Sequence, residues 1–503
     1  MNRRTNKVDT SDLQQFLQSI HTALGNPPDL VSSRLDRYLI LFFSGFVDQQ
    51  RLEEEVIAPL KKRGTKRDGR FNTVDVANES SFSEVLNALL SGMVIIARQG
   101  DTQIEIVNVV QIPHRSVSEP QTEAVIRGPR EGFTELLEIN LALIRKRLRS
   151  EKLRVTGMKI GTLSKTEVCL LHMEGIAQPH IVEEMQRRLN SISIDAILES
   201  NYIEEIIRDH RYSIFPTMQY SERPDMVVGS LLEGKVAVLV DNTPMALIAP
   251  FQFWSGLQAS EDYYTNFYFS TFIRMIRAVF IFMALLFPSL YVAITTFHHE
   301  MLPTNLLFSV AAAREATPFP ALVEVLLMEI TFEALREAGV RLPRPVGQAV
   351  SIVGALVIGQ AAVQAGIVSA PMVIVVSITG IASFTIPRFN MSFALRILRF
   401  PLIVLAGSMG LFGILLGLFA LTIYMTGIRS FGVPYLTPLA PLSLPGLKDL
   451  LIRAPFWTMH KRPQQMVKEN TIRVPAQQPV SSNGGDGSGS TSATSNEQGG
   501  MLP

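Results

Sequence analysis

Three long stretches without a formal charge dominate the second half of the chain and restrict what it can fold into. They run from Ala278 to His299, from Pro345 to Pro387 and from Phe400 to Ile428. A hydrocarbon core about 30 Å thick takes roughly 20 apolar residues of helix. The first and third stretches are therefore long enough for one span each, and the 43 residues of the second are enough for two. We predict four helical spans, with residues 369–371, Ser-Ala-Pro, as the turn within the second stretch.

The segment 317–343, TPFPALVEVLLMEITFEALREAGVRLP, combines apolar surface with four carboxylates. Its prolines favour a helix start and a helix stop, and Glu329, Glu333 and Glu337 recur every four residues and share one face. A charge at mid-helix costs roughly 2.5 to 3.5 kcal/mol on insertion, whereas a large aliphatic side chain returns roughly 0.3 to 0.6 kcal/mol. The helix should not cross lipid alone. It is either a membrane-embedded carboxylate helix, packed on other helices or lining water, or an amphipathic helix at the headgroups.

With residues 303–313 before it, this segment adds a fifth span or a re-entrant pair. We therefore predict an all-α polytopic transmembrane domain of 4 to 6 membrane segments over 272–430. Glu324, Glu329 and Glu333 are its candidate acidic set, although Glu324 lies on another face of the helix.

The basic residues near the predicted spans do not determine whether the number of membrane spans is odd or even. Arg274 and Arg277 place the start of the first span in the cytoplasm, and the positive-inside rule favours the same side for the arginines of 336–344 and for those of a short amphipathic linker, 388–399. The basic residues of 448–462 also favour that side. An odd number of spans forbids this unless the uncharged, four-proline stretch 430–446 dips into the membrane.

The region before residue 272 contains an internal repeat. Val85 to Val107 aligns without gaps on Val227 to Ala249, and both stretches read as helix, Leu-Leu-x-Gly, strand, tight turn and strand. We predict a soluble α/β N-terminal region of two similar subdomains. Two such lobes either form a cleft for a small ligand or serve as a duplicated scaffold for assembly. We expect an N-terminal extension (1–34), subdomain 1 (35–131), a helical linker (132–152) and subdomain 2 (153–271). They are followed by the transmembrane domain (272–430), a proline-rich and basic segment (431–470) and a disordered tail (471–503).

Several functional classes are disfavoured by composition. The net charge is +1 and no basic stripe stands out, which gives no reason to expect a nucleic-acid partner. Cys169 is the only cysteine, so an internal disulfide and a cysteine-based metal site are excluded. The common catalytic signatures for phosphate binding, nucleophilic serine and zinc are missing, so we expect neither an enzyme nor a cofactor. The first thirty residues lack the apolar run of a signal peptide, which predicts a cytoplasmic N-terminal region.

Small residues form a stripe on the helix predicted over 346–370. The stripe follows spacings of four, four, three and four, and two amides stack on the neighbouring face; its residues are Ser351, Ala355, Gly359, Ala362 and Gly366, with Gln360 and Gln364 beside them. Such stripes let helices approach closely, and intramembrane amides bond between helices. In a ring of identical subunits the same helix would line a narrow pore. Simple helix packing explains the pattern equally well. The glycines at 413 and 417 in the last span read as a packing face.

Three motifs carry a resemblance to a known family. PFPALVEVLLMEITFEALREAGVRLP, which begins with Pro318, Phe319 and Pro320, resembles the signature of the GerA family of spore germination proteins, the A subunits of nutrient germinant receptors. SEPQTEAVIRGPREGFTE at 118–135 and LVDNTPMALIAPFQFW at 239–254 are similar to the same family. The resemblance covers about residues 35 to 465.

The resemblance implies a multi-pass protein in the lipid of the spore inner membrane. It also implies two partners, a transporter-like B subunit that holds the main nutrient pocket and a lipoprotein C subunit, and N-terminal lobes similar to substrate-binding-protein folds. The A subunit would be a homo-oligomer that forms a nutrient-gated ion channel and releases cations at germination. We expect the 346–370 helix to line the pore beside the acidic set. The alternative is a ligand-sensing or scaffold subunit that does not itself conduct.

Overall fold

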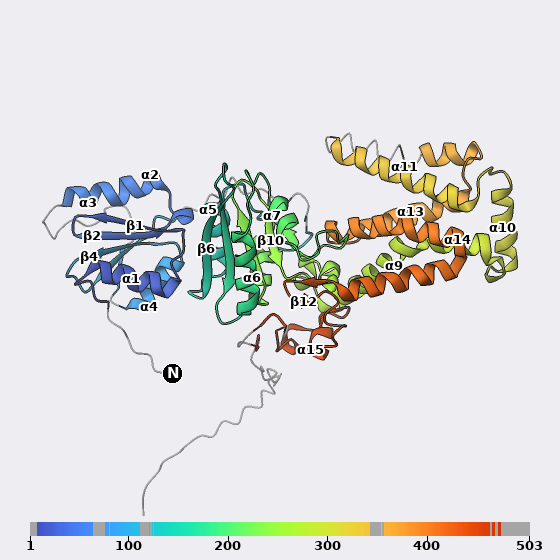
Figure 1. Cartoon of the computed structure of the whole chain (residues 1–503). Helices are drawn as coiled ribbons and strands as arrows, with labels where there is room; N and C mark the ends of the chain where they lie inside the picture. Colours follow the sequence, from blue (N-terminus) through green and yellow to red (C-terminus); the bar gives the residue numbers. More distant parts are fainter. Residues whose placement is uncertain are drawn as a thin grey trace, which may run out of the picture.

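The protein is described here from a computed structural model, in which two α/β subdomains are followed by an elongated helical bundle (Figure 1). The residues that the structure describes are 8–63, 76–79, 81–110, 120, 123, 125–342, 354, 357–462, 465–467 and 471–473.

The first subdomain is built on a five-stranded antiparallel sheet with the strand order β1-β2-β4-β5-β3. Its strands are β1, Leu30–Leu35, β2, Tyr38–Phe43, β3, Val76–Glu79, β4, Val94–Arg98, and β5, Ile104–Val107. Its helices are α1, Leu13–Leu24, α2, Gln49–Arg51, a π-helical stretch, Leu52–Ile57, α3, Ala58–Arg63, and α4, Phe82–Leu90. The hydrophobic core lies between this sheet and the helices, chiefly α1 and α4.

Helix α1 belongs to this subdomain, although the sequence predicts residues 1–34 to be an extension. Leu13, Phe16, Ile20 and Leu24 follow the helical period and are buried in the core that the sheet also supplies. The Asp12 side chain accepts a hydrogen bond from a backbone amide of the first turn and caps the helix. Because α1 and β1 complete the core and the sheet, the extension boundary at residue 34 is wrong.

The second subdomain repeats the architecture. Its sheet has the order β6-β7-β9-β10-β8, which matches the first sheet strand for strand. Its strands are β6, Leu153–Ile160, β7, Thr166–Met173, β8, Gln219–Ser221, β9, Val236–Val240, and β10, Ala246–Ala249. Its helices are α6, Pro179–Asn190, α7, Ser200–Ile207, and α8, Pro224–Leu232. Every residue of β9 and β10 is buried, because apolar cores form on both faces of this sheet.

Helix α5, Leu137–Arg147, connects the two sheets. Arg145 of α5 bonds Asp29 of the first subdomain at 2.6 and 2.8 Å, and its guanidinium stacks over Phe43 at 4.2 Å. Both members of this ion pair are almost fully buried. The same helix packs against α8 of the second subdomain, so α5 fixes one sheet relative to the other.

The helical bundle begins with α9, Phe267–Phe297, and continues with α10, Thr304–Glu315, and α11, Ala321–Arg341. It ends with α13, Ala370–Phe384, and α14, Phe389–Gly427, and residues 357–364 are also helical. Within the described residues, α9 and α14 are long and apolar enough to cross a membrane, and α13 is apolar but shorter. The linker expected at 388–399 is instead the first turns of α14.

Helix α14 reverses direction at Gly410. This residue has φ 61° and ψ −141°, a conformation that side chains resist and glycine adopts freely. The arms on either side pack closely, because a Cβ at Gly413 would lie 2.1 Å from the carbonyl oxygen of Leu405, and one at Gly417 would lie 2.5 Å from Leu402 Cδ2. Figure 1 shows the second arm returning beside the first. The predicted packing role of these glycines is therefore seen within one helical hairpin.

The hairpin brings the following residues back to the second subdomain. Short strands β11, Arg429–Ser430, and β12, Val433–Pro434, pair there, and the hydroxyl of Ser430 donates to the backbone carbonyl of Thr217 at 2.6 Å. Tyr435 is fully buried against Phe251 and Phe215. The four-proline stretch therefore packs on the soluble region, and the basic residues after it lie at the same end of the bundle as Arg274 and Arg277.

The remaining regular elements are short. They are α15, Leu444–Leu447, and 3-10 turns at Ser44–Phe46, Phe253–Leu257, Ser260–Tyr263, His299–Met301 and Phe456–Thr458. The tail predicted from residue 471 lies outside the described residues apart from 471–473.

Candidate functional site: the buried carboxylates of helix α11

Helix α11 starts where the proline-rich family motif ends. Pro320 is its N-terminal cap residue, Pro318 and Phe319 directly precede it, and the helix continues to Arg341. Because a charge inside a membrane is costly, the carboxylates of this helix need partners if the helix enters a membrane. The structure supplies a different arginine to each of the three candidate residues.

Glu329 pairs with Arg399 of α14. The distances from Arg399 Nη1 to the two carboxylate oxygens are 2.9 and 2.8 Å, and each side chain is 2% exposed. The pair lies where α11 packs on the first arm of α14. Two opposite charges withdrawn from solvent at this distance hold the helices in one register.

Glu333, one turn further along α11, contacts two arginines. It forms a charged hydrogen bond with Arg396 of α14, and Arg336 Nη1 lies 3.7 Å from it. Arg336 also donates to the hydroxyl of Ser383 at 2.9 Å and lies over the ring of Phe384 at 4.8 Å, both in α13. Glu333 keeps 38% of its side chain exposed, so this end of the interface is more open than the Glu329 pair.

Glu324 turns toward another set of elements, as its place on the helical wheel predicts. It is fully buried, and its carboxylate accepts the backbone amide of Ser369 at 3.0 Å and the hydroxyl of Thr317 at 3.3 Å. Arg314 of α10 lies 3.6 Å away. Ser369 is the residue before α13, so Glu324 places a negative charge at that helix N-terminus.

Glu337 differs from the other carboxylates of α11. It pairs with Arg341 one turn later at 2.6 Å, and both side chains are more than 60% exposed. Exposed pairs of this kind contribute little to stability. The three candidate carboxylates therefore act as internal ties between α11 and its neighbours, whereas Glu337 lies on the surface.

The predicted small-residue stripe is described only in part. Ser351 and Ala355 lie outside the described residues. Gly359 is buried, and a Cβ there would lie 3.4 Å from Val373 Cγ1 of α13. Ala362 is half-buried. Gly366 has φ 68° and lies in the turn after the helical residues, so the prediction that it extends the stripe is wrong.

The two amides predicted beside the stripe, Gln360 and Gln364, are both exposed. They are separated by one helical turn and lie on the face next to that of Gly359. The single chain therefore leaves two uncharged amides uncovered, beside the exposed apolar side chains of Val357 and Ile358.

The sequence does not identify the partners of the carboxylates, because the arginines at 396 and 399 have the positions expected of membrane-topology signals. Their spacing of three residues, against the spacing of four between Glu329 and Glu333, is the signal that two helices could form two pairs. A second cluster was also missed. Arg274 of α9 bonds Asp262 at 2.9 Å and Asp449 at 2.7 Å, and it is fully buried.

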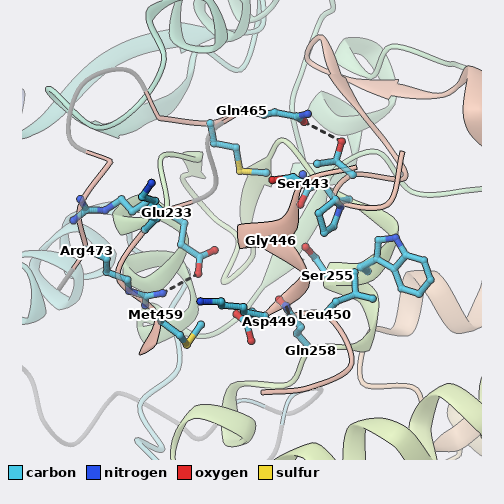
Figure 2. Close-up of a pocket in the computed structure, with 18 of the residues that line it drawn as sticks. Glu233, Ser255, Gln258, Ser443, Gly446, Asp449, Leu450, Met459, Gln465 and Arg473 are labelled. Atoms are coloured by element: carbon cyan, nitrogen blue, oxygen red, sulfur yellow. Dashed lines mark hydrogen bonds and ion pairs between the residues drawn. The ribbon is translucent and has the colours of Figure 1, made fainter. Parts of the chain in front are cut away.

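A cavity of about 430 Å³ lies between the second subdomain and the C-terminal segment 437–473 (Figure 2). The sequence suggests a cleft between the two lobes, but this cavity is elsewhere. Its lining includes Glu233 and Lys235 from the turn between α8 and β9, and Asp449 from the C-terminal segment.

Comparison with known proteins identifies the family. The family model described as Bacillus/Clostridium GerA spore germination protein matches residues 18–465. "Uncharacterized membrane protein YfkQ" of Bacillus subtilis (strain 168) is 48% identical over 84% of this chain and 84% of its own length. "Spore germination protein KA" of the same organism is 45% identical over 86% of this chain and 81% of its own length.

A solved structure is also similar. It is the N-terminal domain of the A subunit of the Bacillus megaterium spore germinant receptor GerK3, which is 30% identical and covers 50% of this chain and 99% of that one, with a TM-score of 0.40. The match of the family model over nearly the whole chain confirms the resemblance carried by the proline-fenced acidic helix and the two other motifs. The chain belongs to the GerA family of spore germination proteins.

Proposed function

We propose that this protein is the A subunit of a nutrient germinant receptor and that several copies of it form an ion channel in the spore inner membrane. The support for the receptor role is the family and the relatives named above as spore germination proteins. The support for a membrane location is the pair of long apolar helices, α9 and α14. Within the described residues the bundle has seven helical stretches, namely α9, α10, α11, residues 357–364, α13 and the two arms of α14, and α9 and α14 are the ones long and apolar enough to cross a membrane.

The observation that carries the channel proposal is the uncovered face of residues 357–364. Gln360 and Gln364 are exposed there, while Gly359 on the neighbouring face packs against α13. An amide that faces hydrocarbon without a partner costs several kcal/mol, on the order of 4 or more. Neighbouring copies or water must therefore satisfy these amides. A ring of copies provides both, because one helix from each subunit then faces a shared, water-filled axis.

The ion pairs of α11 support a gated assembly of this kind. Glu329 and Glu333 bind arginines of α14, so α11 stays attached to the bundle core, while Gln360 and Gln364 in the next described helical stretch stay exposed toward other subunits. The soluble subdomains and the C-terminal segment lie at one end, which we assign to the spore core. A nutrient bound in the complex, together with a transporter-like B subunit and a lipoprotein C subunit, opens the channel only if it binds the open state more tightly.

The test is cation flux from liposomes that contain the full-length chain together with its B and C subunits. We expect nutrient-dependent flux from the wild type and a changed conductance or ion selectivity from Gln360→Leu and Gln364→Leu. Thr422→Val is the matched control, because Thr422 is an exposed polar residue on a different helix, α14. A strictly monomeric chain in detergent, or Gln variants that conduct like the wild type, would overturn the proposal.

A second function is favoured by the 430 Å³ cavity. In this alternative the chain is a ligand-sensing or scaffold subunit, and another subunit conducts. Liposomes that show flux without this chain, combined with ligand binding by the purified chain, would favour the alternative.

A further inference from the structure

The cavity beside the second subdomain is of the size that small-molecule sites have, about 300 to 1,000 Å³. Its walls come from three parts of the chain that are distant in sequence. The second subdomain contributes Glu233 and Lys235, and the C-terminal segment contributes most of the lining (Figure 2). The segment before α9 contributes four residues, Gln252, Trp254, Ser255 and Gln258.

The C-terminal wall of the cavity is held by side-chain hydrogen bonds to backbone carbonyls and by one close approach of two backbone segments. Arg462 Nε donates to the carbonyl of Leu232 at 2.8 Å, and the indole nitrogen of Trp254 donates to the carbonyl of Leu436 at 3.1 Å. The carbonyl of Met466 lies so close to Gly234 that a Cβ there would be 2.3 Å from it. The cavity is therefore bounded by anchored chain on both sides.

Lys235 is the unusual residue of this lining. It is 5% exposed, and within the described residues its ammonium group has no hydrogen bond or ion pair. Lysine is almost never buried this deeply unless it is paired. Burial lowers the pKa of Lys235, against an opposing effect of Glu233 and with a further lowering by Arg388, so the charged form is only partly compensated in the ligand-free chain.

The acidic residues of the lining are already engaged. Asp449 accepts from the hydroxyl of Tyr263 at 2.7 Å and binds Arg274 at 2.7 Å. Glu233 lies 3.6 Å from Arg473, as the dashed line in Figure 2 shows. Lysine and arginine residues outnumber carboxylates in the lining by five to two, so the site has an excess of positive charge; the five are Lys235, Lys448, Lys461, Arg462 and Arg473.

The lining also contains large apolar side chains. Trp254, Leu450 and Met459 belong to it, and Figure 2 shows Met459 and Leu450 on either side of Asp449. An inorganic ion would leave this surface in contact with water. A molecule with both an anionic group and an apolar body would use both parts of the lining.

We propose that this cavity binds a small organic anion, whose carboxylate or phosphate group pairs with Lys235 and whose apolar body packs against Trp254, Leu450 and Met459. The site does not depend on whether the chain conducts ions. It does have a route to the bundle, because Asp449 on its wall binds Arg274 of α9. Occupancy would fix the C-terminal segment against the second subdomain at the point where the first long helix begins.

Calorimetric titration of the full-length chain in detergent tests the site with three molecules that share one ring. They are benzoate, phenyl phosphate and benzylamine. We expect benzoate or phenyl phosphate to bind and benzylamine not to bind, and the stronger of the two anions identifies the anionic group. Failure of both anions to bind the wild type, or equal binding of benzylamine, would overturn the proposal.

Two variants locate the binding. Lys235→Met should weaken anion binding by about tenfold or more, because a charged hydrogen bond is lost. The ligand-free variant should melt at or above the wild-type temperature, since it removes an unpaired buried charge. Ser255→Trp fills the cavity without changing its charge and should also abolish binding.

Lys61→Met is the matched control, because Lys61 is an exposed lysine of the first subdomain. It should bind the anion like the wild type. Wild-type affinity in both Lys235→Met and Ser255→Trp would show that the anion binds elsewhere and would refute the site. If Lys235→Met melts well below the wild type, Ser255→Trp alone decides the question.

Discussion

Arg399 reaches across from α14 to hold both carboxylate oxygens of Glu329, at 2.9 and 2.8 Å, in a part of the bundle where neither side chain is more than 2% exposed. The two residues are 70 positions apart in the sequence. The acidic helix is thus neutralised within its own chain, and its position in the bundle depends on a partner that follows it by more than two helices.

Replacing one residue of the Glu329–Arg399 pair should reduce the stability of the protein far more than replacing both. Glu329→Ala leaves the guanidinium of Arg399 buried and unpaired, which we expect to cost about 3–5 kcal/mol. The double variant Glu329→Met/Arg399→Met should recover most of this loss, because both charges leave together. Thermal melting of the four chains of this double-mutant cycle in detergent measures the effect.

The control for this cycle is on the same helix. Glu337→Ala breaks the exposed pair with Arg341 and should change stability by about 0.5 kcal/mol or less. Equal losses from Glu329→Ala and Glu337→Ala would show that the Glu329 pair is not buried in the membrane-embedded protein.

Glu324 should control the start of α13. Glu324→Ala removes the acceptor of the Ser369 amide and the partner of Arg314, and we expect a loss of about 2 kcal/mol or more. Glu324→Gln keeps an acceptor for the amide and should lose less. Hydrogen exchange should become faster at residues 368–373 in the alanine variant. Glu300→Ala, at an exposed site, serves as the control and should leave exchange there unchanged.

The reversal at Gly410 should be intolerant of a side chain. Gly410→Ala forces alanine into a positive-φ conformation at a cost of about 1–3 kcal/mol, and its Cβ would lie 2.9 Å from His298 Nε2. We expect a lower melting temperature and less monodisperse protein. Gly427→Ala, where a Cβ meets nothing within 4 Å, should behave like the wild type. Similar melting of both variants would argue against the hairpin.

Glu204 in α7 should make stability fall as the pH rises. Burial raises the pKa of Glu204 to about 7 from an ordinary 4.5, against the smaller opposing effect of Arg208 and with a further contribution from Glu199. Below pH 4.5 the carboxyl is protonated in both states. Between pH 4.5 and 7 the unfolded chain loses the proton and the folded chain keeps it, so the folded state becomes less favoured.

Glu204→Gln should remove this dependence and stabilise the chain at pH 8 by about 3 kcal/mol. Melting temperatures of the full-length chain from pH 4.5 to 8 measure the slope. Glu205→Gln alters an exposed neighbour and should leave the slope in place. A wild-type slope in Glu204→Gln would show that another group causes it.

Local patterns predicted much of this fold. The prolines at 318 and 320 and the four-residue spacing of the carboxylates predict α11. The gapless similarity of Val85–Val107 to Val227–Ala249 predicts two similar α/β subdomains, and the structure gives both sheets the same strand order. The spacing of Leu13, Phe16, Ile20 and Leu24 is a helical period and is the local signal for α1 in the first core.

Long-range relationships were beyond the sequence. Arginines beside a span look the same whether they face lipid headgroups or a carboxylate on another helix, so the partners of Glu329 and Glu333 could not be assigned. Gly410 is one of several glycines in an apolar run, and glycine permits a straight helix as well as a reversal. The cavity depends on where residues 437–473 return, which in turn depends on that reversal.

The reversal has a mechanical consequence. The chain leaves the second subdomain through α9 and comes back to it after α14, where Ser430 bonds Thr217. Asp449 of the segment that follows bonds Arg274 at the start of α9. The bundle is therefore connected to the second subdomain at two adjacent points. A single tether would let the bundle swivel without transmitting force. With two, a tilt of the second subdomain acts as a torque on α9 and α14 together, and the soluble region works as a lever on the helices in the membrane.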